Sequence, residues 1–212
     1  MEQLEQVRIL KELLRQVEVG VNVDAGVQFE SPTEVYICPE QAAREWQLFF
    51  QEHPQLIGLS GDLPEPGSYV SLDDFGIPVL ATRDANGKFR AFLNACRHRG
   101  TELVEQRRGK AKCFVCPFHG WTYKSNGELQ AVTQPHDFGS IDRKCFGLIE
   151  LPSVEHNGLL WMHPRPDGQI DVDTLLGDLL PEFKEWSAGD RIFRGETMLD
   201  KRLNWKLAND TF

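Results

Sequence analysis

Cysteine and histidine occur together in two short groups near the middle of the chain. Cys96 and His98 are separated by one residue, Cys116 and His119 by two, and 17 residues lie between the groups. Each group follows a short apolar run that is typical of a β-strand. Because loops that follow neighbouring strands can meet at one end of a small β domain, we expect the four side chains to face one another. Two thiolates and two imidazoles form a ligand set for a transition metal.

This set of donors favours an iron–sulfur cluster. Clusters of the 2Fe–2S type are bound by thiolates, and in the Rieske variant two histidines replace two cysteines on one iron. Such a cluster is neutral when oxidised, whereas four thiolates would make both oxidation states more negative. Adding an electron to a neutral centre costs less, so the reduction potential lies at about −150 to +300 mV instead of roughly −400 mV. The sequence therefore predicts single-electron transfer.

Residues beside the four donors suit two tight loops. Gly100, Gly109 and Gly120 are expected to let backbone N–H groups approach sulfur, where hydrogen bonds change the potential. Pro117 restricts the backbone of the second loop, and Trp121 is expected to cover the site from water. These residues predict a rigid and partly dry surrounding for the metal.

The elements around the loops divide the chain into three predicted regions. The first, residues 1–55, is a helical arm, because apolar residues recur at helical spacing over residues 3–18 and again from Pro39 onward. Residues 35–37 predict a short strand within it. The second region, residues 56–165, is predicted to be an antiparallel β domain of short strands and turns.

The third region comprises residues 166–212. It begins after a stretch rich in proline and glycine, and Asp173 is expected to cap a helix there. The predicted fold class is therefore mainly β, with a helical N-terminal arm before the β domain and a further region after it.

Three segments resemble a known family, the Rieske non-haem iron oxygenases, which include the large (α) subunits of aromatic-ring-hydroxylating dioxygenases. Residues 96–100 are Cys-Arg-His-Arg-Gly and residues 116–123 are Cys-Pro-Phe-His-Gly-Trp-Thr-Tyr, which are similar to the family's two cluster loops. The helical arm also resembles the family's N-terminal segment. Residues 204–207, Asn-Trp-Lys-Leu, resemble the segment that leads to its mononuclear iron site.

The resemblance implies an electron path and a set of partners. A ferredoxin or flavin reductase would reduce the cluster, and the edge of His98 or His119 would pass the electron to a mononuclear Fe(II). That iron would lie in a neighbouring subunit of a homo-oligomer, which is a trimer in the family. It would activate O2 and hydroxylate an aromatic or related organic substrate, as in aromatic hydrocarbon catabolism. Residues expected next to the cluster ligands are Arg99, Gly100, Gly120 and Trp121.

Two departures from related patterns qualify this expectation. Respiratory Rieske proteins usually have a further cysteine in each loop, and this chain has Thr101 and Phe118 there, which favours the oxygenase or ferredoxin branch. The family's mononuclear iron is held by two histidines and a carboxylate beyond the Asn-Trp-Lys segment, and this sequence ends at Phe212. We therefore expect no catalytic residue here, and Asp210 falls too early in the pattern to be one. The third region would be the first part of a truncated α+β catalytic domain.

Two other interpretations stay open. A free-standing Rieske ferredoxin would use the same four ligands as an electron carrier, although such carriers are usually shorter and lack the helical arm. A zinc site is the other, because Cys113 adds a second thiol two residues before Cys116. Strand alternation would turn Cys113 away from that site, so a packing role is favoured.

Composition limits the class of partner. The net charge of −9 and the pI near 5.2 disfavour nucleic acid as a ligand. There is no apolar run long enough for a membrane span and no apparent signal peptide, so a cytoplasmic protein is expected. Basic residues nevertheless gather around the first loop, and these form either a solvated surface, which we favour, or a docking surface for an acidic electron donor: Arg97, Arg99, Arg107, Arg108, Lys110 and Lys112.

Overall fold

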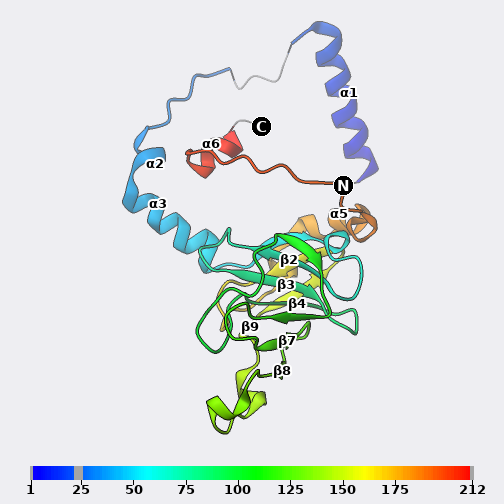
Figure 1. The fold of residues 1–212 in the computed structure, drawn as a ribbon. Coiled ribbons are helices and arrows are strands. Elements are labelled where there is room, and N and C mark those ends of the chain that lie inside the picture. The colour runs from blue at the N-terminus through cyan, green and yellow to red at the C-terminus, as the bar shows by residue number, and fades with distance from the viewer. Residues whose placement is uncertain (1, 22–25, 211–212) are drawn as a thin grey trace.

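The structure is a computed structural model and describes residues 2–21 and 26–210. Along the described residues, a β domain follows an N-terminal helical arm, and a C-terminal segment then returns to the arm, so that the arm and this segment lie on the same side of the β domain (Figure 1). The mainly antiparallel β fold with a helical N-terminal arm is as predicted. Among the described residues, no helix has the length and apolar character needed to cross a membrane.

The arm begins with α1 (Gln3–Val19), which has no buried residue and ends at Gly20 in a left-handed conformation (φ 65°). The short helix α2 (Glu34–Ile37) follows, then α3 (Pro39–Glu45), which continues without a break into a π-helical turn, η1 (Trp46–Gln51). The helix predicted from Pro39 onward is therefore confirmed.

The predicted strand at residues 35–37 is wrong, because this segment is one helical turn closed by the bond from Cys38 N to Glu34 O (2.9 Å). Tertiary contacts override the β preference of Val35 and Ile37. Tyr36 at the centre of the turn packs against the C-terminal segment, with its hydroxyl 2.8 Å from Asp210 Oδ2.

Three antiparallel sheets form the β domain. Their strand orders are β1-β11-β10, β5-β2-β3-β4-β9 and β6-β7-β8. The strand bounds are β1 Gln55–Leu59, β2 Ser68–Leu72, β3 Val79–Arg83, β4 Phe89–Leu93, β5 Arg108–Lys110, β6 Cys113–Val115, β7 Thr122–Lys124, β8 Leu129–Ala131, β9 Glu150–Leu151, β10 Ser153–His156 and β11 Leu159–Met162. The short 3-10 turns among them are η2 Ser60–Asp62, η3 Pro135–Phe138 and η4 Arg143–Phe146.

The five-stranded sheet is the middle layer and separates two hydrophobic cores. Side chains alternate across a strand, so neighbouring residues face opposite sides. Val79 and Ala81 of β3 pack into the core shared with the β1-β11-β10 sheet. Leu80, the residue between them, packs into the core under the β6-β7-β8 sheet, as does Phe92 of β4. Because both faces are covered, these strands are nearly continuous apolar runs.

The core that contains Leu80 and Phe92 also contains Cys96, Cys116 and Trp121. The two cysteine loops are thus built on the layer formed by β6, β7 and β8. Residues 132–149 leave this layer as an extended excursion with η3 and η4, which projects from the bottom of the molecule (Figure 1). Phe138 and Phe146 of the excursion pack back against the same core.

After β11 the chain forms α4 (Val172–Leu176), η5 (Gly177–Leu179), α5 (Leu180–Glu185) and η6 (Ala188–Asp190), and it ends in α6 (Trp205–Asp210). The helix predicted near Asp173 is present, but its cap is Asp171, whose carboxylate accepts a hydrogen bond from Thr174 N at 3.0 Å. Asp173 itself lies in the first turn. The prediction placed the cap two residues late, because both aspartates precede the apolar residues.

Candidate metal centre

The two cysteine loops share one backbone pattern. In loop 1 (residues 96–101), Cys96 N donates to Thr101 O at 2.8 Å and Gly100 N donates to Cys96 O at 2.8 Å. In loop 2 (residues 116–121), Cys116 N donates to Trp121 O at 2.8 Å and Gly120 N donates to Cys116 O at 3.0 Å. The loops are therefore equivalent scaffolds, although histidine is the third residue of loop 1 and the fourth of loop 2.

Gly100 and Gly120 close these loops in a left-handed conformation, with φ of 71° and 70°, which glycine adopts without strain. Their own N–H groups bond to cysteine carbonyl oxygens and not to sulfur. Gly109 lies in β5, packed against the ring of Tyr69, and has no place in either loop. In loop 1, the N–H of His98 bonds to the Cys96 sulfur instead.

The four predicted donors come together as two pairs. The side chains of Cys96 and Cys116 are buried and close enough to interact directly, and neither forms a disulfide. The rings of His98 and His119 meet at a centroid distance of 4.7 Å. Both histidines lie between the buried thiols and the surface, since each is partly exposed. Thiol thus pairs with thiol and imidazole with imidazole.

The electrostatics of the pairs indicate a bound cation. Burial raises the pKa of the Cys96 thiol, and the neighbouring Cys116 raises it further, so a thiolate there needs a positive partner. Burial, followed by the charges of His119 and Arg99, lowers the pKa of His98 and favours the neutral imidazole that binds metals. His119 Nδ1 is buried without a hydrogen-bond partner among the described residues. The site therefore fits a group that supplies positive charge and takes up that nitrogen.

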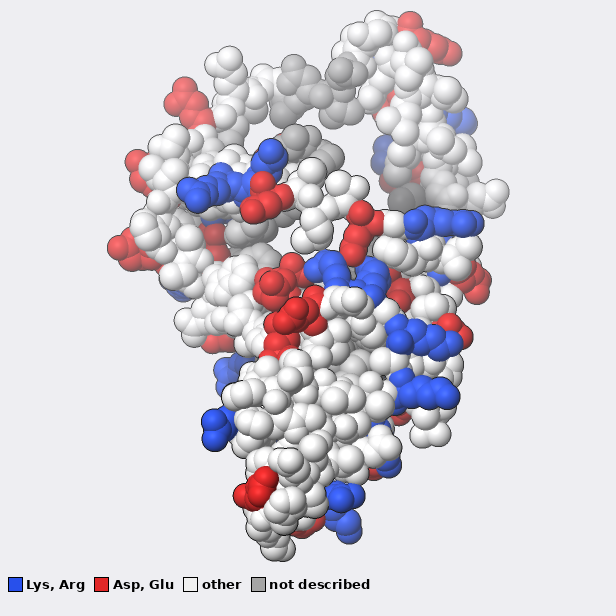
Figure 2. Space-filling model, viewed as in Figure 1, with Lys and Arg blue, Asp and Glu red and all other residues white. Residues whose placement is uncertain are grey.

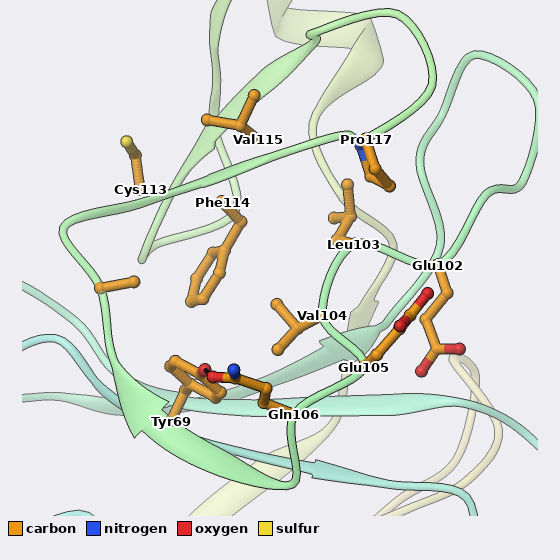
Figure 3. A pocket seen from close by; sticks show the side chains of 11 residues that line it. Tyr69, Glu102, Leu103, Val104, Glu105, Gln106, Cys113, Phe114, Val115 and Pro117 are labelled. Carbon is orange, nitrogen blue, oxygen red and sulfur yellow. Dashed lines mark hydrogen bonds between the residues drawn. The ribbon is translucent and has the colours of Figure 1, made fainter.

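The pairing suits two metal ions better than one. Each iron of a Rieske cluster takes only two side chains, because sulfide fills its other positions, whereas a structural zinc ion takes four protein ligands. Among the described residues, no group of three or more histidine, cysteine or carboxylate side chains is placed to hold one ion. Cys113 and Val115 point away from the face of β6 that Phe114 presents to the core (Figure 3), as strand alternation predicts.

Tyr123 is a site residue that the sequence interpretation missed. It is fully buried, and its hydroxyl lies 3.3 Å from Cys96 Sγ and 3.0 Å from the donating N–H of Arg97. Burial raises the pKa of Tyr123 above its usual range, so the hydroxyl keeps its proton and donates to a thiolate at Cys96. Its place two residues after Trp121, at the start of a strand-like run, was the available signal, because residues two apart in extended backbone point to the same side.

Asn94 was also missed. Its side chain is fully buried, and its hydrogen bonds go to the segment that follows loop 1 and to Ser71 of β2. Its Nδ2 donates to Val104 O (2.7 Å), to Ser71 Oγ and to Glu102 Oε1, and its Oδ1 accepts from the N–H groups of Leu103 and Val104. A buried, fully satisfied amide two residues before Cys96 holds both ends of loop 1 in place.

Aromatic rings shield the histidine pair. Trp121, predicted to cover the site, is buried and stacks on His98 with a centroid distance of 5.2 Å and an interplanar angle of 11°. Phe138 meets the same imidazole edge-on at 5.0 Å. Phe118 lies against His119 at 3.8 Å and is itself exposed. The buried Trp121 and the partly buried Phe138 thus shield part of the His98 ring, whereas Phe118, the ring beside His119, is exposed.

The basic residues around loop 1 divide into two sets. Arg107 and Arg108 pair with Glu196, and Lys110 pairs with Glu65. Basic and acidic side chains interleave over the face shown in Figure 2, so no continuous basic surface covers it. Arg97 and Arg99, on either side of His98, are exposed. Lys112 is exposed as well. Three of the six basic residues are therefore paired within the chain, and Arg97 and Arg99 are the exposed ones that lie within loop 1.

A cleft of about 380 Å³ lies beside the loops (Figure 3). The segment from Glu102 to Gln106 forms one wall, and β6 with Pro117 forms the other. Phe114 and Tyr69 meet edge-to-face at its base, with centroids 5.6 Å apart. The residues that line this cleft do not include Trp121, Phe118 or Phe138.

Comparison with known proteins agrees with this geometry. A family model described as the Rieske [2Fe-2S] domain matches residues 53–152. The chain is 46% identical over 177 residues to the large oxygenase component of the naphthalene 1,2-dioxygenase system of Pseudomonas putida, covering 80% of this chain and 37% of that protein. It is 37% identical, with the same coverage, to the large oxygenase component of a 2,4-dinitrotoluene dioxygenase system of Burkholderia sp. (strain RASC). The chain therefore spans little more than a third of these relatives.

Solved structures place the fold in the same group. A naphthalene 1,2-dioxygenase variant bound to phenanthrene matches with a TM-score of 0.62 and 36% identity, over 69% of this chain and 34% of that one. A quaternary ammonium Rieske monooxygenase matches with a TM-score of 0.77 over 87% of this chain and 52% of that one, at 23% identity, which shows a shared fold. By sequence and by fold, this chain belongs to the large-subunit family of Rieske oxygenases and carries that family's [2Fe–2S] domain.

Proposed function

We propose that Cys96 and Cys116 bind one iron of the Rieske cluster, that His98 and His119 bind the other, and that the chain passes single electrons through it. The observation that carries this is the pairing of the donors, thiol with thiol and ring with ring, together with the unpartnered Nδ1 of His119. That nitrogen is the ligand atom we assign to His119. The cluster supplies one-electron redox chemistry with a potential set by its charge and surroundings.

The chain's own residues determine how that chemistry is used. The hydroxyl of Tyr123 and the N–H of His98 donate to the Cys96 sulfur and stabilise negative charge there. Trp121 and Phe138 keep water from the His98 ring. The exposed edge beside His119 and Phe118 gives electrons a short way in and out of the protein.

Arg97 and Arg99 support an acidic electron donor as the partner, since exposed charges at the rim steer the encounter of proteins. We take this donor to be a ferredoxin or flavin reductase. We assign the docking role to these two arginines and not to the larger basic surface that the sequence suggested, because most of the other basic residues of that surface are paired within the chain.

The activity of a whole protein containing this chain is a wider proposal, because the chain spans 37% of its relatives' length. We propose that it hydroxylates an aromatic or related organic substrate with O2 at a mononuclear iron held by residues beyond Phe212, within a cytoplasmic homo-oligomer. The names of the dinitrotoluene and naphthalene relatives support the substrate class. We also propose the division into an arm (1–55), a cluster domain (56–165) and the start of a catalytic domain (166–212); its last two residues lie outside the described part.

The first experiment is an iron, zinc and labile-sulfide analysis of anaerobically purified protein, with visible and EPR spectra before and after reduction by dithionite. We expect about two irons and two sulfides per chain and an EPR signal only after reduction. Zinc in place of iron and sulfide would overturn the cluster assignment. The coding sequence beyond Phe212 tests the wider proposal, which requires a histidine pair and a distant carboxylate there.

A further inference from the structure

The excursion (residues 132–149) is fastened to the β domain at its two ends. At its start, Val132 is buried in the core under the β6-β7-β8 sheet. At its end, Leu148 is buried in the same core, and its N–H donates to Gly127 O at 2.8 Å. These anchors leave the middle of the excursion, residues 134–142, to be held by other contacts.

The middle of the excursion has few attachments to the rest of the protein. Among the described residues, the hydrogen bonds made by residues 134–142 all stay within the excursion itself. Most of these residues are exposed, and only Phe138 and Ile141 are partly buried. Both pack against the core that contains Cys96 and Cys116. Two apolar side chains therefore hold this polar segment against the domain.

One of these two side chains, Phe138, lies against a proposed cluster ligand. Its ring meets the imidazole of His98 edge-on, with the ring centroids 5.0 Å apart and an interplanar angle of 89°. Trp121 stacks on the same imidazole at 5.2 Å and meets Phe138 at 5.6 Å, with an interplanar angle of 78°. The imidazole is therefore in contact with two rings that lie at a steep angle to each other.

Packing, and not hydrogen bonding, determines the orientation of the His98 ring. Among the described residues, neither ring nitrogen of His98 has a hydrogen-bond partner. Rotation of an imidazole about its bond to Cβ is only weakly restricted by the side chain itself. In most metal-binding histidines a hydrogen bond to the second nitrogen fixes this rotation. At His98, the stack on Trp121 and the edge contact with Phe138 take the place of that hydrogen bond.

We propose that Phe138 is a positioning residue for the cluster, which holds the His98 ring against Trp121 and keeps water from that side of the site. This rests on the proposed function, in which His98 binds one iron. The proposed cluster is neutral when oxidised and carries one negative charge when reduced. Water stabilises the charged form more than an apolar ring does, so the ring of Phe138 lowers the reduction potential.

The first test equilibrates the purified protein with a redox dye of known potential and measures the ratio of reduced to oxidised cluster. We expect Phe138→Ala to raise this ratio about fivefold at a fixed potential, because water gains access beside His98. Phe138→Leu, which restores an apolar side chain, should return the ratio to within about twofold of the wild-type value.

The matched control for this test is Phe146→Ala. Phe146 belongs to the same excursion, packs against the same core and meets Trp121 at 5.8 Å. Among the described residues, its ring has no contact with His98 or His119 rings, so the ratio should stay within about twofold of the wild-type value. An unchanged ratio in Phe138→Ala, or an equal shift in Phe146→Ala, overturns the proposal.

A second experiment does not depend on which metal the protein holds. Hydrogen–deuterium exchange, followed by mass spectrometry, measures the opening of residues 134–142 and of loop 1 in the protein as purified. Phe138→Ala should speed exchange in both segments about tenfold, because its side chain ties one segment to the other. Phe118→Ala, which removes the exposed ring beside His119, should leave both within about twofold.

Exchange at the wild-type rate in Phe138→Ala overturns the positioning role. The two experiments also separate this proposal from the proposed function. If the wild-type protein holds no 2Fe–2S cluster, the proposed function fails, while the exchange rates still decide whether Phe138 holds loop 1.

Discussion

Loop 1 and loop 2 are the same scaffold in different surroundings. Each is closed by a bond from its cysteine N–H and by a glycine N–H that returns to the cysteine carbonyl. Around loop 1, however, the Cys96 sulfur meets the Tyr123 hydroxyl and the His98 ring is covered by Trp121. Beside loop 2, the His119 ring lies against the exposed Phe118 and the His98 ring.

The contacts found in both loops concern cluster binding, whereas the contacts found at one loop concern the reduction potential of the cluster and the access of a partner. Each loop supplies one thiol and one imidazole, so under the proposed function both loops are needed equally to hold the cluster. We expect the contacts that only loop 1 has to affect the reduction potential, through Tyr123 on the Cys96 sulfur, and the approach of a partner, through the charges of Arg97 and Arg99. Substitutions in the shared part should therefore remove the cluster, and substitutions in the unshared part should alter its behaviour.

The largest effect is expected where the loops are equivalent. Cys96→Ser and Cys116→Ser should each abolish the cluster, because serine does not replace a thiolate to iron. Cys113→Ser is the matched control and should retain iron, sulfide and colour, since Cys113 faces away from the core that contains both ligands. Elemental analysis and visible spectra measure the outcome. Loss of the cluster in the Cys113 variant, or its retention in either of the others, would contradict the assignment.

Replacing His119 by Cys tests the charge argument. A third thiolate adds one negative charge to both oxidation states, so the potential should fall towards the roughly −400 mV of all-thiolate clusters. The measurement is a redox titration followed by EPR on protein with verified iron and sulfide content. An unchanged potential in an intact cluster would show that ligand charge does not set the potential of this site.

Reversing the charge of the loop 1 rim should slow reduction by an acidic donor. Arg97→Glu combined with Arg99→Glu is expected to lower the second-order rate constant at least about tenfold at low ionic strength, with the difference shrinking as salt screens the charges. Arg44→Glu, an exposed arginine on α3, tests for a general effect of net charge. The measurement is the second-order rate constant for reduction of the cluster by the donor, obtained by stopped flow at several salt concentrations. Equal slowing by the Arg44 variant would mean that the rim has no special part.

The smallest effect is expected from removing the Tyr123 hydroxyl, which contacts the sulfur of Cys96. Tyr123→Phe removes the donor to Cys96 and should lower the potential by about 40 mV, equivalent to roughly 1 kcal/mol of lost stabilisation of the reduced cluster. Tyr69→Phe is the control, because Tyr69 lies in the same core and its hydroxyl contacts Gln106 instead. A potential unchanged to within a few millivolts would exclude this hydrogen bond as a determinant.

Much of the fold followed from local patterns. The antiparallel β domain of short strands and turns was predicted and is present, because apolar runs and turn residues act over a few neighbouring residues. The strand predicted at 35–37 failed where local preference met a tertiary contact, since Tyr36 packs against α6. That the four side chains bind one cluster stays a prediction; the structure shows the two thiols beside each other and the two imidazole rings beside each other, a pairing that the sequence did not reveal.

The sequence by itself determined which atoms are offered to a metal, because each loop carries its cysteine, histidine and glycine within a few residues and closes through its own backbone. Tertiary structure alone decided what surrounds them. The hydroxyl on Cys96 comes from 27 residues away. Such contacts depend on how sheets and helices pack against one another, and no spacing along the chain encodes that packing.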